Sequence, residues 1–269
     1  MATDLERAPA PTATGLLAGK RILVTGLLTD RSLAYHAAAT MQEQGADVVL
    51  TSFGRAKRIT ERAAQTLPKA ADVLELDVSK DADYDALVED LGSRWDAVDG
   101  VLHSVAFAPP ELFKTPFLHA DHEQIDSAMR ISAYSLQRLA AALLPLMART
   151  GNGASIVGLT VEERVRVHPY AWMSVAKQTL NAVARQLAVH VADHDVRVNM
   201  VAAGPVRTNA GSVIPEFSEM EETYQRAPLG WDSRDHTAIA GPATFLMSDL
   251  SRKMTGTVMY VDGGMHILI

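Results

Sequence analysis

The stretch KRILVTGLLTDRSLAYHAAATMQEQG, residues 20–45, decides the fold. It opens with a β-branched apolar run that ends at Gly26, and an alanine-rich segment follows from Ser32 to Gly45. A short apolar run before a glycine is typical of a buried strand. A segment that a serine can cap and a glycine can end is typical of a helix. The stretch therefore predicts a strand, a tight turn and a helix.

The same alternation continues along the chain. Further strands are predicted at 46–53, 72–78, 98–107, 153–159, 196–204 and 256–264, and further helices at 55–68, 81–95, 121–147, 171–193 and 236–248. Strands that are apolar on both faces are typical of a parallel sheet between two layers of helices. We predict a single α/β domain at 16–269, a Rossmann-type doubly wound parallel sheet with helices on both faces, after a mobile tail at 1–15. The segment 205–229 is predicted to be mostly irregular.

Composition narrows the class of protein. The chain has 269 residues, 48% of them hydrophobic and 21% charged, and these values are typical of a soluble globular protein. The net charge of −7 argues against a nucleic-acid binder and against attraction to anionic membranes. The absence of cysteine excludes disulfides and thiolate zinc sites, and we expect no metal. No apolar run approaches the roughly 18 residues that span a bilayer, so we expect a cytoplasmic protein without membrane contact.

Residues suited to bind a nucleotide follow the predicted strands, at the edge where ligands of such sheets bind. Gly26 permits a tight turn before a helix whose N-terminus offers N–H groups to a pyrophosphate. Phe53 ends the second strand, where an acid usually receives the ribose hydroxyls of NAD. Several such features at one edge favour a dinucleotide. The other features are Asp77 and Val78 after the third strand, the small residues from Ser104 after the fourth, and Gly204, Pro205 and Thr208 after the sixth.

A second motif, YAWMSVAK at 170–177, places Tyr170 and Lys177 at the entrance to a predicted helix. Six residues separate the tyrosine from the lysine, and Met173 stands one helical turn before Lys177. Alone, a tyrosine at a helix start and a lysine on its surface are ordinary structural residues. Their position at the predicted nucleotide edge makes them candidate catalytic residues.

Together with LELDV, HSVAFAP, SIVGLT, RVNMVAAGPVRT and the final VDGG, these motifs resemble the bacterial enoyl-acyl carrier protein reductases. This family is a divergent branch of the short-chain dehydrogenases and reductases, and the likeness runs from about residue 15 to the C-terminus. It is strongest to the actinobacterial members, which include the mycobacterial target of isoniazid. The resemblance implies NADH-dependent reduction of the trans-2 double bond of an enoyl thioester on acyl carrier protein, in fatty-acid elongation. It also implies a homotetramer.

The resemblance also implies roles for individual residues. Tyr170 would donate a hydrogen bond to the thioester oxygen, and Lys177 would hold the nicotinamide ribose. The substrate would lie against Phe107, Val161, Tyr170 and Met173, under the substrate-binding segment 205–229. The cofactor would contact Gly26, Ser32 and Leu33 through its pyrophosphate; Phe53, Asp77 and Val78 through its adenosine; Ser104, Val105, Ala106, Ile131 and Lys177 through its ribose and nicotinamide; and Ala203, Gly204, Pro205, Val206 and Thr208 at its closing loop.

The Tyr–Lys spacing is chemically informative beside this resemblance. Most of the superfamily has tyrosine and lysine one turn apart and protonates a carbonyl oxygen directly. An enoyl thioester accepts hydride two atoms from its carbonyl carbon, so its hydroxyl donor must stand further out. Met173 at the nearer position donates no proton, which argues against a carbonyl or alcohol oxidoreductase. That activity and a non-catalytic NAD(P)-binding sensor remain the alternatives.

Three features depart from the family pattern or leave a choice open. Val161 stands nine residues before Tyr170, where relatives carry an aromatic side chain, and this predicts a larger pocket. The segment 209–225 is shorter than the substrate loop of the mycobacterial enzyme, which favours short or medium acyl chains. Arg55 or Lys57 could reach a 2′-phosphate, so NADPH is possible, although the family likeness favours NADH.

Overall fold

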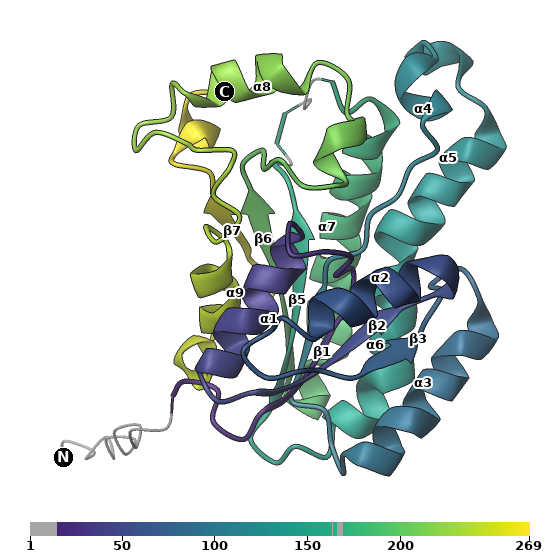
Figure 1. Cartoon of the computed structure of the whole chain (residues 1–269), viewed down its shortest axis with the longest axis vertical. Helices are drawn as coiled ribbons and strands as arrows, with labels where there is room; N and C mark the ends of the chain where they lie inside the picture. Colours follow the sequence, from purple (N-terminus) through teal and green to yellow (C-terminus); the bar gives the residue numbers. More distant parts are fainter. Residues whose placement is uncertain (1–14, 163, 166–168) are drawn as a thin grey trace.

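The computed structural model describes residues 15–162, 164–165 and 169–269. The tail expected at 1–15 lies outside the described residues except for its last position. Among the described residues, seven parallel strands form one sheet in the order β3-β2-β1-β4-β5-β6-β7 (Figure 1). The strands are β1 (Arg21–Val24), β2 (Asp47–Ser52), β3 (Val73–Glu75), β4 (Gly100–His103), β5 (Ala154–Thr160), β6 (Val196–Ala203) and β7 (Val258–Val261). This order reverses between β1 and β4, and the predicted doubly wound sheet is confirmed.

Helices cover both faces of the sheet, as the apolar strands predicted. One apolar core lies under α1 (Leu33–Glu43), α2 (Gly54–Ala64) and α9 (Ala240–Met247). The other lies under α3 (Asp81–Arg94), α6 (Ser135–Met147) and α7 (Trp172–His190). Successive residues of β5 alternate between these cores: Ile156 packs in the second, and Val157 and Leu159 pack in the first. Residues of even number on β5, including Thr160, therefore face α6 and α7.

A third apolar cluster is formed by elements beyond the carboxyl ends of the strands, which lie in the upper part of Figure 1. It joins α4 (Glu111–Lys114), α5 (His122–Met129), the start of α7 and α8 (Phe217–Tyr224). Asp121 caps α5, because its carboxylate accepts hydrogen bonds from the N–H groups of Glu123 and Gln124 at 2.9 and 3.1 Å. This cluster, which we call the apolar chamber, lies over the edge where the fold places its ligand.

Several predicted elements were wrong in extent, and the segment predicted to be mostly irregular contains a helix. The fourth strand ends at His103, four residues early, because side chains instead of a neighbouring strand bind the backbone of residues 104–107. The segment 205–229 contains α8, whose buried Met220 and Tyr224 lie one turn apart within a charged run. The last helix begins at Ala240, because the Asp235 carboxylate accepts from the N–H and hydroxyl of Thr237 and so holds a turn before it.

A helical irregularity joins α5 to α6. Residues Arg130–Tyr134 form one π-helical turn within the long helix predicted at 121–147. Such turns widen a helix by one residue and are frequent at functional sites. Ile131, expected beside the cofactor, lies in this turn, and its carbonyl accepts a 2.7 Å hydrogen bond from the Ser135 hydroxyl.

Candidate active site

The first strand-to-helix turn requires glycine at one position. Gly26 has a φ of +79°, and a Cβ atom there would lie 2.2 Å from the carbonyl oxygen of Ser104. Thr25 links the same two strand ends, because its hydroxyl donates to the Leu102 carbonyl at 3.0 Å and accepts from the Ser104 N–H at 3.3 Å. The ends of β1 and β4 are thus held in contact at the topological switch point, where α/β sheets bind ligands.

Ser32 has a different local role from the one its position predicts. It occupies the N-cap position of α1 without a side-chain cap, and its hydroxyl accepts from the N–H groups of Leu28 and Thr29 at 3.0 and 3.1 Å. The first turn of α1, which Leu33 opens, contains no acidic residue. The first N–H groups of a helix have no partner within it and attract anions. This turn therefore fits a pyrophosphate.

The adenosine candidates lie at the ends of β2 and β3. Phe53 precedes α2 with 46% of its surface exposed, so its ring is available to a flat ligand. Burial raises the pKa of Asp77, but hydrogen bonds from the Ser79 hydroxyl and N–H outweigh it and hold that pKa below its usual value. Val78 is half-buried beside Asp77, and its carbonyl accepts from the Tyr84 hydroxyl at 3.0 Å. These contacts fix the turn after β3 at the candidate adenosine site.

The loop after β4 is clamped by one serine of the π-helical turn. The Ser132 hydroxyl accepts from the N–H of Phe107 and donates to its carbonyl, both at 2.9 Å. Ser104 and Val105 are half-buried, whereas Ala106 and Phe107 are exposed. The exposed pair follows a fixed backbone, so its small and aromatic side chains can border a bound ligand.

Lys177 of α7 and Tyr170, two residues before that helix, flank this edge. The Lys177 ammonium donates a 2.9 Å hydrogen bond to the Leu159 carbonyl at the end of β5. Lys177 is 8% exposed, and burial lowers its pKa to about 8. Tyr170 is 9% exposed, and burial, the one cause of the shift, raises the pKa of its phenol to about 12. Tyr170 is thus a neutral donor at physiological pH, and Lys177 is a partly desolvated cation.

Tyr170 stands in the apolar chamber, and the expected substrate residues Val161 and Met173, but not Phe107, belong to the same cluster. Met173 is buried in the same cluster, and Val161 is half-buried against it. Tyr224 of α8 also belongs to the apolar chamber and is 8% exposed. Its ring packs edge-on against the Trp231 ring, with the two ring centroids 6.5 Å apart. Burial is the largest cause that raises the pKa of Tyr224, and the nearby Asp262, Tyr170 and Glu162 raise it further. Sequence reasoning missed Tyr224 because it lies in a charged run.

The segment after β6 crosses back to the glycine turn. The Asn209 amide donates to the Thr29 hydroxyl at 2.9 Å, and the Arg31 guanidinium donates to the Arg207 carbonyl at 3.0 Å. Arg207 pairs in turn with Glu221 of α8. These bonds join the segment that carries α8 to the turn that would hold the pyrophosphate.

The closing loop is itself tightly packed. A Cβ at Gly204 would lie 2.6 Å from the Trp231 ring, whose indole N–H donates to the Pro205 carbonyl at 2.7 Å. The Thr208 hydroxyl accepts from the Gly211 N–H at 2.9 Å. Ala203 is half-buried and Val206 buried. The loop therefore presents mainly backbone and small groups toward the edge.

A buried polar pair lies under the site, and the sequence analysis did not single out its two residues. His103 ends β4, is fully buried, and has its Nε2 atom 2.8 Å from the Ser135 hydroxyl. Burial, and then the charge of Lys177, lower the pKa of His103 to about 3, so the ring is neutral. Its Nδ1 atom and the Thr160 hydroxyl are both buried without a hydrogen-bond partner in the described part of the chain. Both side chains lie on the sheet face that α6 and α7 cover.

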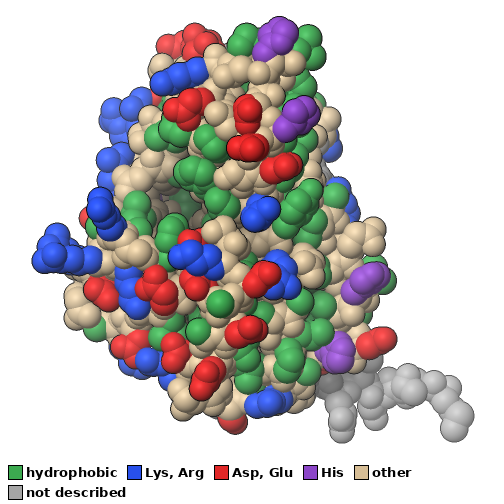
Figure 2. All heavy atoms as spheres, turned by 90° about the vertical axis from the view of Figure 1, so that its right-hand side faces the viewer, with side chains coloured by type: hydrophobic (Ala, Val, Ile, Leu, Met, Phe, Trp, Pro, Cys, Tyr) green, Lys and Arg blue, Asp and Glu red, His purple; other side chains and the backbone are tan. Residues whose placement is uncertain are grey.

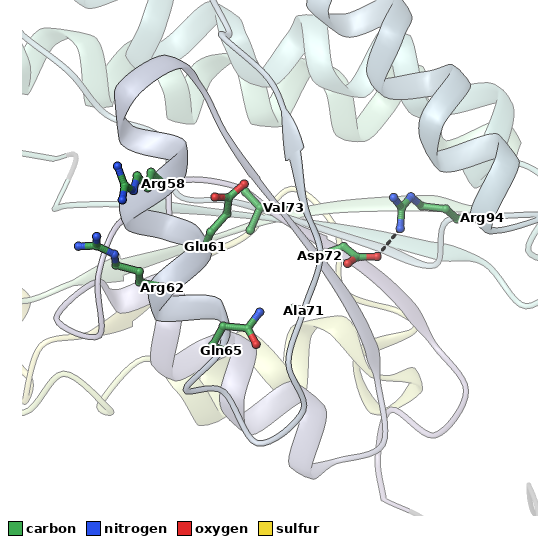
Figure 3. A pocket seen from close by; sticks show the side chains of 8 residues that line it. All are labelled: Arg58, Glu61, Arg62, Gln65, Ala71, Asp72, Val73 and Arg94. Carbon is green, nitrogen blue, oxygen red and sulfur yellow. Dashed lines mark hydrogen bonds and ion pairs between the residues drawn. The ribbon is translucent and has the colours of Figure 1, made fainter.

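A surface pocket elsewhere has different properties. Its volume is about 590 Å³, and it is lined by Arg58, Glu61, Arg62, Gln65, Ala71, Asp72, Val73 and Arg94 (Figure 3). It lies between the end of α2, the start of β3 and the end of α3, at the amino ends of the strands. Arg94 and Asp72 form an ion pair there. Ligands of doubly wound sheets bind at the opposite edge, so we assign the chemistry there.

The face turned toward the viewer in Figure 2 is hollowed about midway up, and hydrophobic side chains show at the hollow. Acidic and basic side chains are mixed over this face. Among the described residues, no helix combines the length and apolar character needed to cross a membrane. No group of His, Cys, Asp or Glu side chains among them is arranged to hold a metal ion.

The switch-point glycine, the acid-free start of α1, the buried Lys177 of α7 and the buried Tyr170 before that helix are features of a Rossmann-type oxidoreductase whose residues fit a nicotinamide dinucleotide. Comparison with known proteins refines this class. The family model "Enoyl-(Acyl carrier protein) reductase" matches residues 26–266. The chain belongs to the enoyl-acyl carrier protein reductase family.

Individual relatives cover nearly the whole chain. A protein of Mycolicibacterium smegmatis named enoyl-[acyl-carrier-protein] reductase [NADH] is 42% identical, over 93% of this chain and 97% of its own. A protein of the same name from Mycobacterium avium is 40% identical over the same shares. A Neisseria meningitidis protein named enoyl-[acyl-carrier-protein] reductase [NADH] FabI is 37% identical, over 94% of this chain and 97% of its own. The expected likeness to actinobacterial members is confirmed.

Proposed function

We propose that this protein reduces the trans-2 double bond of enoyl thioesters on acyl carrier protein, with NADH as the reductant, in fatty-acid elongation. One observation carries the proposal. Tyr170 stands in the apolar chamber just before α7, and six residues separate it from a buried lysine that is fixed to the end of β5. The names of the relatives support the same reaction and cofactor.

When bound, NADH supplies a hydride to the β-carbon of the enoyl thioester. Negative charge then develops on the thioester oxygen, and the Tyr170 hydroxyl donates a hydrogen bond to it. A fixed donor in apolar surroundings stabilises such a charge more than water does. With a pKa of about 12, the phenol keeps its proton at neutral pH. Tyr170 therefore acts as an oxyanion donor, and its neutral state persists throughout the physiological range.

Lys177 binds the nicotinamide ribose hydroxyls and favours the developing anion by its charge. Its bond to the Leu159 carbonyl uses one of the three ammonium protons, which leaves two for the ribose. A pKa of about 8 keeps most of the ammonium protonated at neutral pH. Burial of Lys177 thus sets both its position and the pH range in which it works.

Met173 separates this site from that of a carbonyl reductase. It occupies the helical turn before Lys177, is buried in the apolar chamber, and carries a thioether that donates no proton. A ketone oxygen bound at that point would meet no acid from this position. This arrangement favours the enoyl substrate over the carbonyl or alcohol substrate.

Two further properties rest on the family likeness. We propose that the protein meets an acyl carrier protein in the cytoplasm and assembles as a homotetramer. The strand β7 is the last of the sheet, and all four of its residues are half-exposed, which is compatible with a covered edge in an assembly. Sedimentation velocity on the full chain tests the assembly, because a stable monomer would contradict it.

A single spectrophotometric experiment tests the activity. Loss of NADH absorbance is followed with a trans-2-enoyl thioester, with a 3-ketoacyl thioester, and with neither. We expect turnover of the enoyl thioester alone. Turnover of only the ketoacyl thioester would assign the protein to the carbonyl reductases, and NADH binding without turnover of either would assign it to the sensors.

A further inference from the structure

The nucleotide edge contains an acid that the chain order conceals. The residues at the end of β2 are Ser52, Phe53 and Gly54, and none of them is acidic. In the sheet, however, Ser52 pairs in register with Glu75, the last residue of the neighbouring β3. The Glu75 carboxylate reaches across and accepts a 2.8 Å hydrogen bond from the Gly54 N–H. The tip of β2 therefore has a carboxylate, delivered by another strand.

This carboxylate is held ionised at the start of α2. The hydrogen bond from the Gly54 N–H is the largest cause that lowers the pKa of Glu75, and it outweighs the opposing effect of burial. Lys57, one turn into α2, lies 3.3 Å from the other carboxylate oxygen, and Lys80 adds a weaker charge from the turn after β3. Half of the side chain is exposed, so the carboxylate can reach a ligand.

The position is the one that distinguishes the two nicotinamide dinucleotides. In doubly wound sheets an acid at the end of the second strand accepts hydrogen bonds from the adenosine ribose hydroxyls, whereas a cation there accommodates a 2′-phosphate. Lys57 is the cation nearest to this acid in the described structure, and Glu75 engages it directly. A 2′-phosphate would have to lie beside the carboxylate and compete with it for Lys57.

We propose that Glu75 selects NADH over NADPH, by accepting a hydrogen bond from the adenosine ribose and by repelling a 2′-phosphate. The proposal rests on the proposed function only for the place where the dinucleotide binds. The proposal adds Glu75 of β3 as a residue that determines cofactor specificity. The candidates from the sequence, Arg55 and Lys57 of α2, would both favour NADPH.

Binding measurements on the full chain test this without any enoyl substrate. The dissociation constants of NADH and NADPH are measured by nucleotide fluorescence for the native protein and for Glu75→Gln, whose amide oxygen can still accept from Gly54. We expect the ratio of NADPH to NADH dissociation constants to fall roughly tenfold in Glu75→Gln, and less at high salt, because the charge is half-exposed and screened.

Two variants make the result specific. Glu61→Gln removes the same charge from the exposed side of α2 at the opposite edge, beside the pocket of Figure 3, and should leave the ratio unchanged. In Glu75→Gln, Lys57 loses its partner and becomes available to a 2′-phosphate. The double variant Glu75→Gln/Lys57→Met should therefore lose most of the NADPH affinity that Glu75→Gln gains. Thermal unfolding of each variant shows whether it folds. If Glu75→Gln fails to fold, Glu75→Asp, which shortens the reach of the carboxylate, replaces that variant.

An unchanged ratio in folded Glu75→Gln, or an equal change in Glu61→Gln, would overturn the proposal. A native protein that binds NADH selectively but reduces no enoyl thioester would refute the proposed function and leave this inference standing. The two outcomes are thus distinguishable.

Discussion

The Lys177 ammonium donates a 2.9 Å hydrogen bond to the carbonyl oxygen of Leu159, and this bond fixes a buried cation to the end of β5. The neighbouring Thr160 closes the strand, and Tyr170 begins the approach to α7 on the far side of the connecting segment. The strand end holds the ammonium relative to the sheet, and Tyr170, two residues before α7, is tied to that helix because its carbonyl accepts a 2.9 Å hydrogen bond from the Met173 N–H.

The activity is predicted to depend on the protonation of Lys177. Since its pKa is about 8 in the free protein, kcat/KM for the enoyl thioester should be level near neutral pH and should decline above about pH 8 as the ammonium loses its proton. The pKa of Tyr170 is about 12, so the phenol should contribute no ionisation below pH 10 or so. A pH profile of kcat/KM checks this, and a profile that stays flat to pH 10 would contradict it.

The same lysine should make stability depend on pH in a defined direction. Its pKa falls from 10.5 in the unfolded chain to about 8 in the folded protein. Between these values the unfolded state binds more protons than the native state, so stability contributed by this group rises with pH across that window. Urea midpoints at the two ends of the window measure the effect. Lys177→Met should abolish the rise in stability with pH that this residue causes. An equal pH dependence of stability in the native protein and in Lys177→Met would refute the assignment of this effect to Lys177.

Tyr170→Phe is predicted to lower kcat by roughly 100-fold, because one donor to the developing oxyanion is removed. The ring keeps its packing in the apolar chamber, so NADH affinity and thermal stability should change little. Tyr35→Phe is a matched control, since its hydroxyl bonds the Thr66 carbonyl away from the site. A Tyr170→Phe protein that retained full kcat would remove this residue from the mechanism.

Much of the fold was predictable from local pattern. Apolar runs on β-branched residues that alternate with helical segments predicted all seven strands and a doubly wound parallel sheet, because short-range periodicity indicates the elements and right-handed crossovers favour that kind of sheet. Strand ends were less predictable. Residues 104–107 resemble a strand in composition, but the side chains of Thr25 and Ser132, distant in sequence, bind their backbone instead.

The site was predictable where one segment carries the chemistry and unpredictable where several segments meet. Gly26, Tyr170 and Lys177 belong to contiguous motifs, so the sequence alone predicts them at one edge of the sheet. Glu75 completes the end of β2 only through strand register, and its sequence neighbours gave no sign of it. Tyr224 was missed because the acidic residues around it hid its one-turn spacing from Met220.

Tyr224 is predicted to form the pocket wall that Val161 leaves open. Both side chains pack in the apolar chamber with Tyr170, so the Tyr224 ring confines a substrate that meets only a small side chain from position 161. Tyr224→Ala should lower kcat/KM for the enoyl thioester roughly tenfold, mainly through KM. Tyr224→Phe keeps the ring and should stay near the native value.

A double-mutant cycle separates this role from a general loss of stability. Val161→Phe restores an aromatic wall, so it should recover part of the activity of Tyr224→Ala while adding little to the native protein. Steady-state kinetics of the four proteins give the coupling. Purely additive effects would show that the two positions do not share one pocket.

Short or medium acyl chains are predicted to be the better substrates. The segment 209–225 contains a 3₁₀ turn at Gly211–Val213 and one short α-helix, α8, which an ion pair between Glu221 and Arg207 joins to the loop after β6. This leaves a short cover for the acyl chain. A series of enoyl thioesters of increasing length checks the expectation through kcat/KM. A rise that continued into the very long chains would contradict it.

Backbone strain next to Tyr170 is the basis of the last prediction. Ala171 has a φ of 44° and a ψ of −123°, a conformation that costs a residue with a Cβ about 1–3 kcal/mol and suits glycine. Met173 donates its N–H to the Tyr170 carbonyl at 2.9 Å, so the helix begins directly after this strained residue and fixes the direction of the phenol. Ala171→Gly should therefore be at least as stable as the native protein, because relief of strain offsets the greater freedom of glycine in the unfolded chain.

Ala171→Val should instead lose about 2 kcal/mol, since a β-branched side chain tolerates positive φ poorly. The glycine variant should nonetheless lose several-fold in kcat with unchanged NADH affinity, because glycine also permits conformations that turn the phenol away from the thioester oxygen. Thermal unfolding and steady-state kinetics of the two variants test both parts. If glycine and valine destabilise equally, the backbone at position 171 is unstrained; if the glycine variant keeps full kcat, the strain does not orient Tyr170.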